Sequence, residues 1–199
     1  DKVTIYNKDL KEITKEILTY DGTIESAKKN GFEHFMIKEI NDEPSTLTYT
    51  YEQFFKNNIK ELMKNMPDFS KYKNIDIIGC GSAYHAGLIG KSFLEEYAEI
   101  PTSVYLASEY RYSKTFSDNK TLTILISQSG ETADTLAALR KAKQNNIDTL
   151  GIINTVGSSI AREALNVFYI KVGCEVSVAT TKAYSAQVLI LMLIALSIA

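Results

Sequence analysis

Several residue types that define other protein classes are scarce in this sequence. Only two cysteines are present, and Cys80 and Cys174 form no Cys-x-x-Cys pair, so neither a zinc site nor a disulfide framework is predicted. We expect both thiols to be reduced and buried, which is typical of a cytoplasmic protein. There are only two histidines, and neither a Ser-His-Asp spacing nor a metal-ligand cluster surrounds them. We therefore expect no metal and no cofactor.

Charge of one sign and long apolar runs are also lacking. A net charge of -2 and a pI near 5.8 argue against a nucleic-acid-binding face. The twelve tyrosines are scattered and form no base-stacking platform. The longest apolar run, residues 188–199, is shorter than the ~20 residues of a membrane span, and no secretory signal opens the chain. We expect no nucleic-acid partner, no membrane partner and a cytoplasmic location.

The most informative segment that is present is a polar turn at residues 127–132. It follows an apolar, β-branched run at 121–126 and precedes a helical pattern at 133–144. A helix N-terminus offers unpaired N–H groups and partial positive charge, so an anion fits there. Serine and threonine add short donors, and Gly130 allows close approach of the backbone. The segment contains no lysine or arginine, and no Walker-type loop is present, so it predicts a site for one phosphate monoester.

The pattern from residue 74 onward predicts an α/β fold with a doubly wound parallel sheet of five strands between helices. The expected strands are 75–78, 103–107, 122–126, 150–153 and 167–172, and the expected helices are 83–97, 133–144, 158–164 and 181–199. Earlier helices are expected at 33–41 and from Pro44, a favoured first-turn proline, to Pro67. Ligands of such sheets bind at the carboxyl ends of the strands.

Other polar segments leave alternatives open. The glycines of residues 79–81 lack the third glycine and the acidic residue of a dinucleotide site. Ser158 and Ser159 are interpreted first as helix caps, whereas residues 127–132 hold more polar side chains than one cap needs. Lys182 either neutralises an anion or solvates the start of a helix.

The two ends of the chain predict a segment of a longer polypeptide. The chain begins at Asp1 without methionine, and its last helix is apolar on all sides without a C-capping signal. Residues 1–30 are polar and mixed, with a possible strand at 3–6 and a turn at Asp21-Gly22. We interpret 1–30 as the end of a preceding domain with its linker, and 31–199 as a sugar-phosphate-binding domain.

Six segments together resemble a known family. They are residues 33–40, 80–87, 107–112, 127–136, 156–159 and 178–183. Residues 127–132 resemble a sugar isomerase (SIS) domain. The 33–40 and 179–183 segments narrow the resemblance to the first SIS subdomain of the glutamine:fructose-6-phosphate aminotransferase family, and it covers essentially the whole chain. Residues 1–30 then resemble the end of the glutaminase domain.

The resemblance implies a set of site residues. The positions that correspond to substrate- and phosphate-binding residues of the family are Ser82, Ser127, Gln128, Ser129, Thr132, Val178 and Thr180. The chain departs from the family at Ala83, where serine is frequent, so one phosphate donor is missing or is replaced by backbone. Thr180 also stands where serine is common, and this change keeps the hydroxyl.

The resemblance also implies partners and absent groups. The family's isomerising residues belong to the second SIS half and the tail, and its glutaminase cysteine lies elsewhere, so we expect no catalytic residue in this chain. The expected partners are fructose 6-phosphate or glucosamine 6-phosphate, a second SIS domain, a glutaminase domain and a second copy in a homodimer.

Two other functions compete with this interpretation. One is a regulatory sugar-phosphate sensor, which would carry a basic helix-turn-helix, whereas residues 1–40 are rich in Asp and Glu. The other is a stand-alone phosphosugar isomerase. Such an enzyme needs a base from this chain, for which Glu175 and His85 are the candidates.

Overall fold

The computed structural model describes residues 3–15, 28–55, 66–114 and 117–199. Its main sheet has five parallel strands in the order β4-β3-β5-β6-β7. The strands are β3 (Asn74–Gly79), β4 (Thr102–Leu106), β5 (Thr121–Ser127), β6 (Asp148–Ile153) and β7 (Asn166–Tyr169). The connections from β3 and β5 leave in opposite directions along the sheet, which makes the boundary between these neighbours the topological switch point. The predicted doubly wound fold is therefore confirmed.

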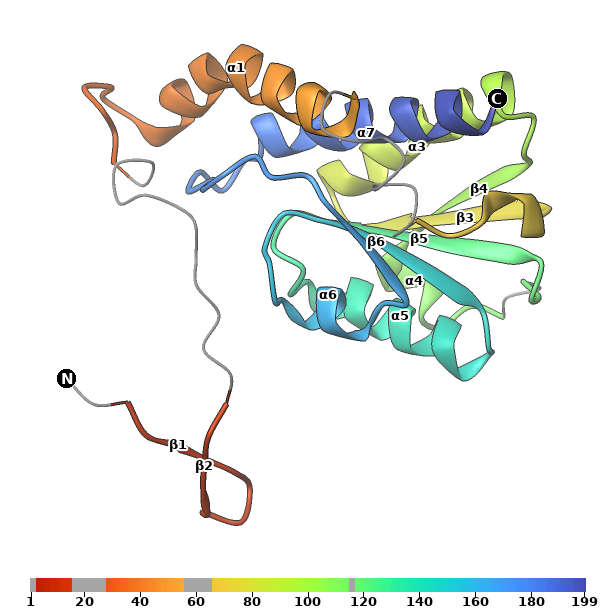
Figure 1. Cartoon of the computed structure of the whole chain (residues 1–199), viewed down its shortest axis with the longest axis horizontal. Helices are drawn as coiled ribbons and strands as arrows, with labels where there is room; N and C mark the ends of the chain where they lie inside the picture. Colours follow the sequence, from red (N-terminus) through yellow and green to blue (C-terminus); the bar gives the residue numbers. More distant parts are fainter. Residues whose placement is uncertain (1–2, 16–27, 56–65, 115–116) are drawn as a thin grey trace.

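Helices cover both faces of this sheet (Figure 1). Helices α1 (Phe35–Phe55), α3 (Ser82–Tyr97) and α7 (Lys182–Ile198) form one layer, in which α7 packs against both α1 and α3. On the other face lie α4 (Ala107–Tyr110), α5 (Ala133–Gln144) and α6 (Ser159–Glu163). A short 3-10 helix, η2 (Phe69–Lys71), precedes β3.

The strands are buried on both faces, because helices lie above and below them. In β5, Leu122, Ile124 and Ile126 face the core under α3 and α7, whereas Leu125 faces the core under α4 to α6. The alternation follows the two-residue period of a strand. A β-branched and largely apolar run such as 121–126 is typical of a parallel strand covered on both sides.

The predicted helix start at Pro44 is wrong, because Pro44 lies inside α1. Proline removes one helical N–H donor and crowds the preceding turn. Polar side chains near Pro44 also donate to carbonyls of α1, Asn41 Nδ2 to Ile37 O at 2.7 Å and Thr48 Oγ1 to Pro44 O at 2.8 Å. The packing of α1 along α7 keeps both halves in line. The predicted continuation toward Pro67 lies in part outside the described residues.

The N-terminal residues form a small separate sheet. Strands β1 (Ile5–Tyr6) and β2 (Glu12–Ile13) pair antiparallel with each other and do not join the main sheet. The first overlaps the strand expected at 3–6, whereas the expected Asp21-Gly22 turn lies outside the described residues. The domain boundary near residue 30 stays a prediction.

Within the described ranges, none of the helices combines the length and the hydropathy that a bilayer span requires.

Candidate functional site: polar turns at the switch point

The predicted phosphate turn leaves β5 at the switch point and enters α5. Ser127 is buried, and its Oγ accepts a hydrogen bond from Gly130 N at 3.0 Å and lies 3.1 Å from Thr132 Oγ1. Ser129 Oγ accepts from Glu131 N at 3.2 Å. A hydroxyl that accepts from a backbone N–H keeps its own proton for another acceptor. The turn thus presents hydroxyl donors beside a helix N-terminus.

The N-terminus of α5 lacks a side-chain cap, although threonine is a favoured capping residue. Thr132 is the N-cap residue but makes no capping hydrogen bond, because its hydroxyl contacts Ser127 instead. The first N–H groups of a helix have no partner within the helix. They are therefore available to an acceptor from outside, and a phosphate is an acceptor that suits the helix dipole.

Gly130 connects this turn to the β6–α6 turn. It has a φ of +66°, and a Cβ added to it would lie 2.0 Å from Ser158 Oγ. Its carbonyl accepts from Ile160 N at 3.0 Å, and Gln128 O accepts from Asn154 N at 3.2 Å. Backbone hydrogen bonds thus hold the two turns together, and the side chains of Ser158 and Ile153 leave no space for a Cβ at residue 130.

Glu131 caps α6. Its Oε1 accepts from Ser159 N at 2.7 Å, and this backbone hydrogen bond lowers the pKa of the Glu131 carboxyl. This hydrogen bond links the β5–α5 turn, which contains Glu131, to the β6–α6 turn, which contains Ser159. Ser158 precedes that helix without making a capping hydrogen bond, so the cap expected from Ser158 is supplied by Glu131.

The β3–α3 turn lies next to the phosphate turn, since β3 and β5 are neighbours. Ser82 is the first residue of α3 and is exposed at its N-terminus. Thr135 Oγ1 of α5 lies 3.8 Å from Cys80 Sγ, which joins the two turns directly. The N–H of Ala83 donates to Cys80 O at 3.2 Å, so it is engaged within the turn and does not replace a serine hydroxyl.

Val178 and Thr180 lie on a different segment, the loop between β7 and α7. Val178 is fully exposed, and Thr180 Oγ1 donates to Glu175 Oε2 at 2.5 Å. In the described part of the chain, the link from this loop to the phosphate turn runs through Asn154. Its side chain accepts from Val172 N and donates to Gly173 O, while its backbone N–H donates to Gln128 O.

The two candidate bases, Glu175 and His85, have surroundings that do not indicate a role in proton transfer. Both oxygens of Glu175 accept hydrogen bonds at the start of α7, from the Thr180 hydroxyl and, at 2.8 Å, from Thr181 N. Glu175 is therefore a helix cap. His85 is exposed on α3, and its ring lies 5.5 Å from that of Tyr84. Neither residue reaches the phosphate turn through a hydrogen bond of the described residues.

Two charged residues have roles that the pattern did not reveal. Lys182 is buried and pairs with Asp42 at 3.5 Å, so it neither meets solvent nor stands free for an anion. Arg111, which ends α4, donates to Asp134 in the first turn of α5 at 2.6 Å, and this contact raises the pKa of the guanidinium. In the sequence Arg111 stood out only as a member of the 107–112 segment, which follows an expected strand. Arg111 thus neutralises a carboxylate in the first turn of α5.

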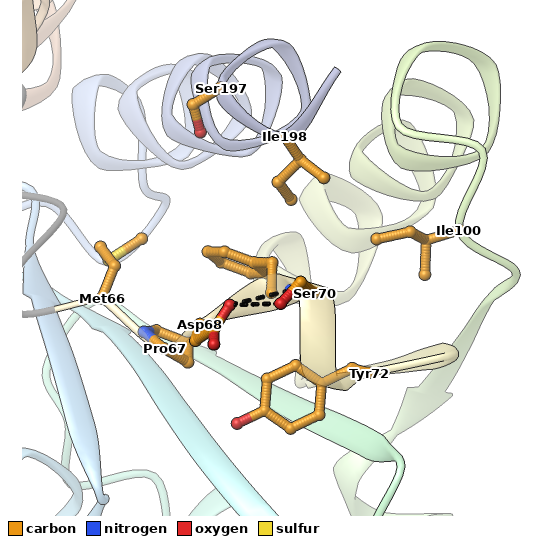
Figure 2. Close-up of a pocket in the computed structure, with 9 residues that line it drawn as sticks. Met66, Pro67, Asp68, Ser70, Tyr72, Ile100, Ser197 and Ile198 are labelled. Carbon is orange, nitrogen blue, oxygen red and sulfur yellow. Dashed lines mark hydrogen bonds between the residues drawn. The ribbon is translucent and has the colours of Figure 1, made fainter.

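Two cavities lie away from these turns. The larger, about 600 Å³, is bounded by η2 and the end of α7, with Phe69, Tyr72, Ile100 and Ile198 in its lining (Figure 2). The smaller, about 380 Å³, is lined by Asp76 and Ser117 near the amino ends of the strands. Neither contains a predicted site residue, so the candidate site is formed by open turns at the opposite edge of the sheet.

The buried carboxylate of Asp76 is expected to lower the free energy of unfolding. Its side chain is buried, with a 2.5 Å hydrogen bond from Ser117, and burial raises the pKa of its carboxyl above the ordinary 3.8. The folded state therefore binds this proton more tightly than the unfolded state, and the carboxylate lowers stability increasingly as the pH rises through the folded pKa. We expect Asp76→Asn to raise the free energy of unfolding at pH 7 by about 1 kcal/mol.

The gain from Asp76→Asn is expected to vanish below about pH 3, where the wild-type carboxyl is protonated in both states. Urea unfolding of wild type and variant from pH 2.5 to 8 measures it. A difference that stays constant across this range would contradict the assignment of the cost to the charge.

Comparison with known proteins identifies the family. The model of the SIS domain family matches residues 68–197, and the chain belongs to this family. Among its relatives is the Clostridium tetani glutamine–fructose-6-phosphate aminotransferase [isomerizing], which is 44% identical over 202 residues. That match covers 98% of this chain and 33% of the relative, so the chain spans about a third of the length of the relatives it matches.

Solved structures support the same placement. The C-terminal domain of glucosamine-fructose-6-phosphate aminotransferase from Francisella tularensis aligns with a TM-score of 0.80 and 38% identity, over 86% of this chain and 49% of that chain. A glucosamine-6-phosphate deaminase from Thermotoga maritima aligns with a TM-score of 0.68 and 27% identity, over 81% of this chain and 48% of that one. The predicted resemblance to an SIS domain is thus confirmed.

Proposed function

We propose that this chain is the sugar-phosphate-binding SIS domain of an isomerising glutamine–fructose-6-phosphate aminotransferase, with fructose 6-phosphate or glucosamine 6-phosphate as its ligand. The observation that supports this most is the uncapped N-terminus of α5 beside the hydroxyls of Ser127, Ser129 and Thr132. A single phosphate monoester matches this donor set in size and charge. The names of the relatives supply the identity of the sugar.

The proposed site divides the sugar phosphate between two parts of the chain. The phosphate binds at the Ser127–Thr132 turn, with Gln128 and the neighbouring Ser82 at its sides. The sugar extends toward Val178 and Thr180 on the β7–α7 loop. Binding energy from the phosphate, which does not react, positions the reacting carbons.

The chemical step belongs to other parts of the protein in this proposal. Glu175 is engaged at the start of α7 and His85 is exposed, so we assign neither as a base. The proposal assigns the isomerising and ammonia-releasing groups to a second SIS domain and a glutaminase domain, and a chain that spans about a third of its relatives' length is compatible with this. The proposal includes a homodimer in the cytoplasm as the assembled form.

Thermal-shift titration of this chain tests the phosphate site. The panel is fructose 6-phosphate, glucosamine 6-phosphate, free fructose and inorganic phosphate. We expect stabilisation by both hexose phosphates and none by fructose, with a gain of about 2.7 kcal/mol at 100 times the dissociation constant. Ser129→Ala removes one hydroxyl donor and is expected to weaken binding about tenfold.

Ser159→Ala is the matched control, because this serine follows a neighbouring strand and its hydroxyl accepts from Arg162 Nη2 at 3.2 Å. It is expected to leave the hexose phosphate shift unchanged. Equal stabilisation by fructose and fructose 6-phosphate would contradict a phosphate site. An unchanged shift for Ser129→Ala would place the ligand outside the Ser127–Thr132 turn.

A further inference from the structure

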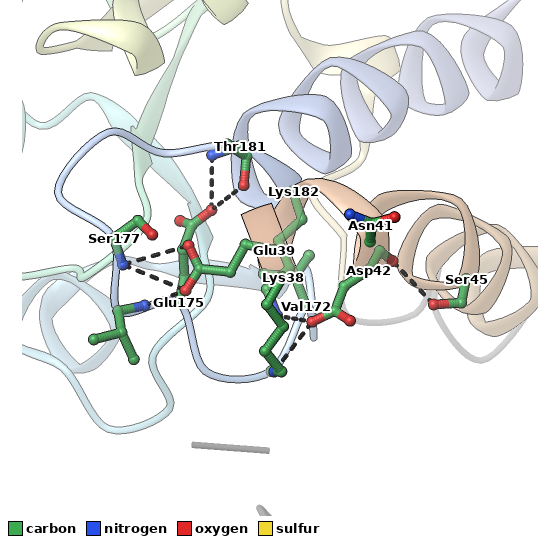
Figure 3. Close-up of polar contacts among 12 residues, drawn as sticks. Lys38, Glu39, Asn41, Asp42, Ser45, Val172, Glu175, Ser177, Thr181 and Lys182 are labelled. Carbon is green, nitrogen blue, oxygen red and sulfur yellow. Dashed lines mark hydrogen bonds and ion pairs between the residues drawn. The ribbon is translucent and has the colours of Figure 1, made fainter. Parts of the chain in front are cut away.

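Helix α1 carries a buried glutamate that binds the backbone of the β7–α7 loop. Glu39 is 1% exposed, and its Oε1 accepts from Val176 N at 2.6 Å and from Ser177 N at 3.3 Å (Figure 3). Its Oε2 also lies 3.3 Å from Ser177 N. The loop has no sheet or helix partner for these N–H groups, so this carboxylate is what satisfies them.

A cluster of two buried lysines and the partly exposed carboxylate of Asp42 links α1 to the start of α7. Asp42 lies 3.2 Å from Lys38 Nζ and 3.5 Å from Lys182 Nζ, and both lysines are no more than 5% exposed. Buried charges that lose a partner are strongly destabilising, so the three groups hold the two helices in one register. Glu39 is therefore presented to the loop from a rigid element.

A second carboxylate holds the other end of the same loop. Glu175 accepts from the Thr180 hydroxyl at 2.5 Å, from Thr181 N at 2.8 Å and from Ala183 N at 3.3 Å. Between Ser177, the last residue bound by Glu39, and Thr180 lie only Val178 and Ala179. Val178 is fully exposed although it is apolar, so it is held outward without a partner in the described part of the chain.

We infer that Glu39 is a positioning residue for the sugar site, which sets the place of Val178 and Thr180 by binding the backbone at Val176 and Ser177. This inference rests on the proposed function, in which Val178 and Thr180 face the sugar. Glu39 acts through the loop and touches no sugar atom. The phosphate turn is held by other contacts, around Gly130 and Asn154, so Glu39 affects the sugar end of the ligand and leaves the phosphate end intact.

The experiment compares Glu39→Gln with Glu43→Gln in the full chain. Glu43 lies one turn further along α1 and contacts a side chain of α7, Ser185 Oγ, at 3.3 Å instead of the loop backbone. Isothermal titration measures the affinity for fructose 6-phosphate and for inorganic phosphate. We expect Glu39→Gln to weaken fructose 6-phosphate binding about tenfold and phosphate binding less than twofold. Glu43→Gln is expected to change neither.

Amide hydrogen exchange gives a readout that needs no ligand. Glu39→Gln removes the charge and replaces one of the two acceptor oxygens with an amide donor, so the N–H groups of Val176 and Ser177 are expected to exchange at least tenfold faster while those of α5 do not change. Glu39→Asp, whose carboxylate is one methylene shorter, is the second variant, and is expected to act in the same direction.

Equal weakening of both ligands, or an unchanged affinity for fructose 6-phosphate in both Glu39 variants, would overturn the inference. Unchanged exchange at Val176 and Ser177 would also overturn it, by showing that Glu39 does not hold the loop. If the wild-type chain binds neither ligand, the proposed function fails and the role at the sugar fails with it. Faster exchange in that case shows only a structural contact, so the two failures are distinguishable.

Discussion

Gly130→Ala is expected to cause the largest loss of stability among the substitutions considered and to abolish binding at the proposed phosphate site. The added Cβ would lie 2.0 Å from Ser158 Oγ, 2.6 Å from Ser158 Cβ and 2.9 Å from Ile153 Cγ2, and the backbone φ is +66°. Because both turns would have to move apart, we expect a loss of at least about 3 kcal/mol in the free energy of unfolding. Urea denaturation measures this loss, and the thermal-shift titration reports the binding.

Gly173→Ala separates steric clash from backbone strain. Gly173 has a φ of +72°, but a Cβ there meets nothing within 4 Å. Its replacement is expected to cost only about 1 kcal/mol, the penalty of a left-handed alanine. Similar losses for both variants would show that the contact of residue 130 with Ser158 does not determine the turn. A Gly130→Ala protein with normal binding would place the phosphate elsewhere.

Glu175→Ala is expected to give the second largest loss of stability. Its removal leaves the N–H groups of Thr181 and Ala183 and the Thr180 hydroxyl without the acceptor they have in the structure. Hydrogen bonds to a charged group contribute more than neutral ones, and their loss at a part-buried site is expected to cost about 3 kcal/mol. Urea denaturation again provides the measurement.

Glu131→Ala is the matched control for Glu175→Ala. Glu131 also caps a helix by binding one backbone N–H, that of Ser159, but its carboxylate is exposed to solvent. Water replaces the lost acceptor there, so a smaller loss is expected. If Glu175→Ala is as stable as wild type and abolishes isomerase turnover in an active assembly, Glu175 is a base and its assignment as a helix cap is wrong.

The strands, and the sheet edge formed by their carboxyl ends, could be predicted because they depend on the local pattern of apolar and polar residues. Short β-branched runs such as 121–126 alternate with helical segments, and this order requires parallel pairing with crossover helices. The polar turns at Ser82 and Ser127 follow two of these strands, so their common edge was predictable. The strand order was not predictable in this way. Only the structure shows that β3 and β5 are neighbours at the switch point.

The fold class, the resemblance to the SIS family and the hydroxyl-rich turn before α5 could all be inferred from the amino-acid sequence, because periodicity and residue chemistry are local properties. Other features depend on contacts between distant residues. Pro44 stays in a continuous helix because α1 packs on α7. Lys182 can be buried because it pairs with Asp42, a residue 140 positions earlier in the chain. Glu39 reaches Val176 across 137 residues. Such contacts depend on how rigid elements meet in space, and no local pattern specifies which distant residue will supply the partner.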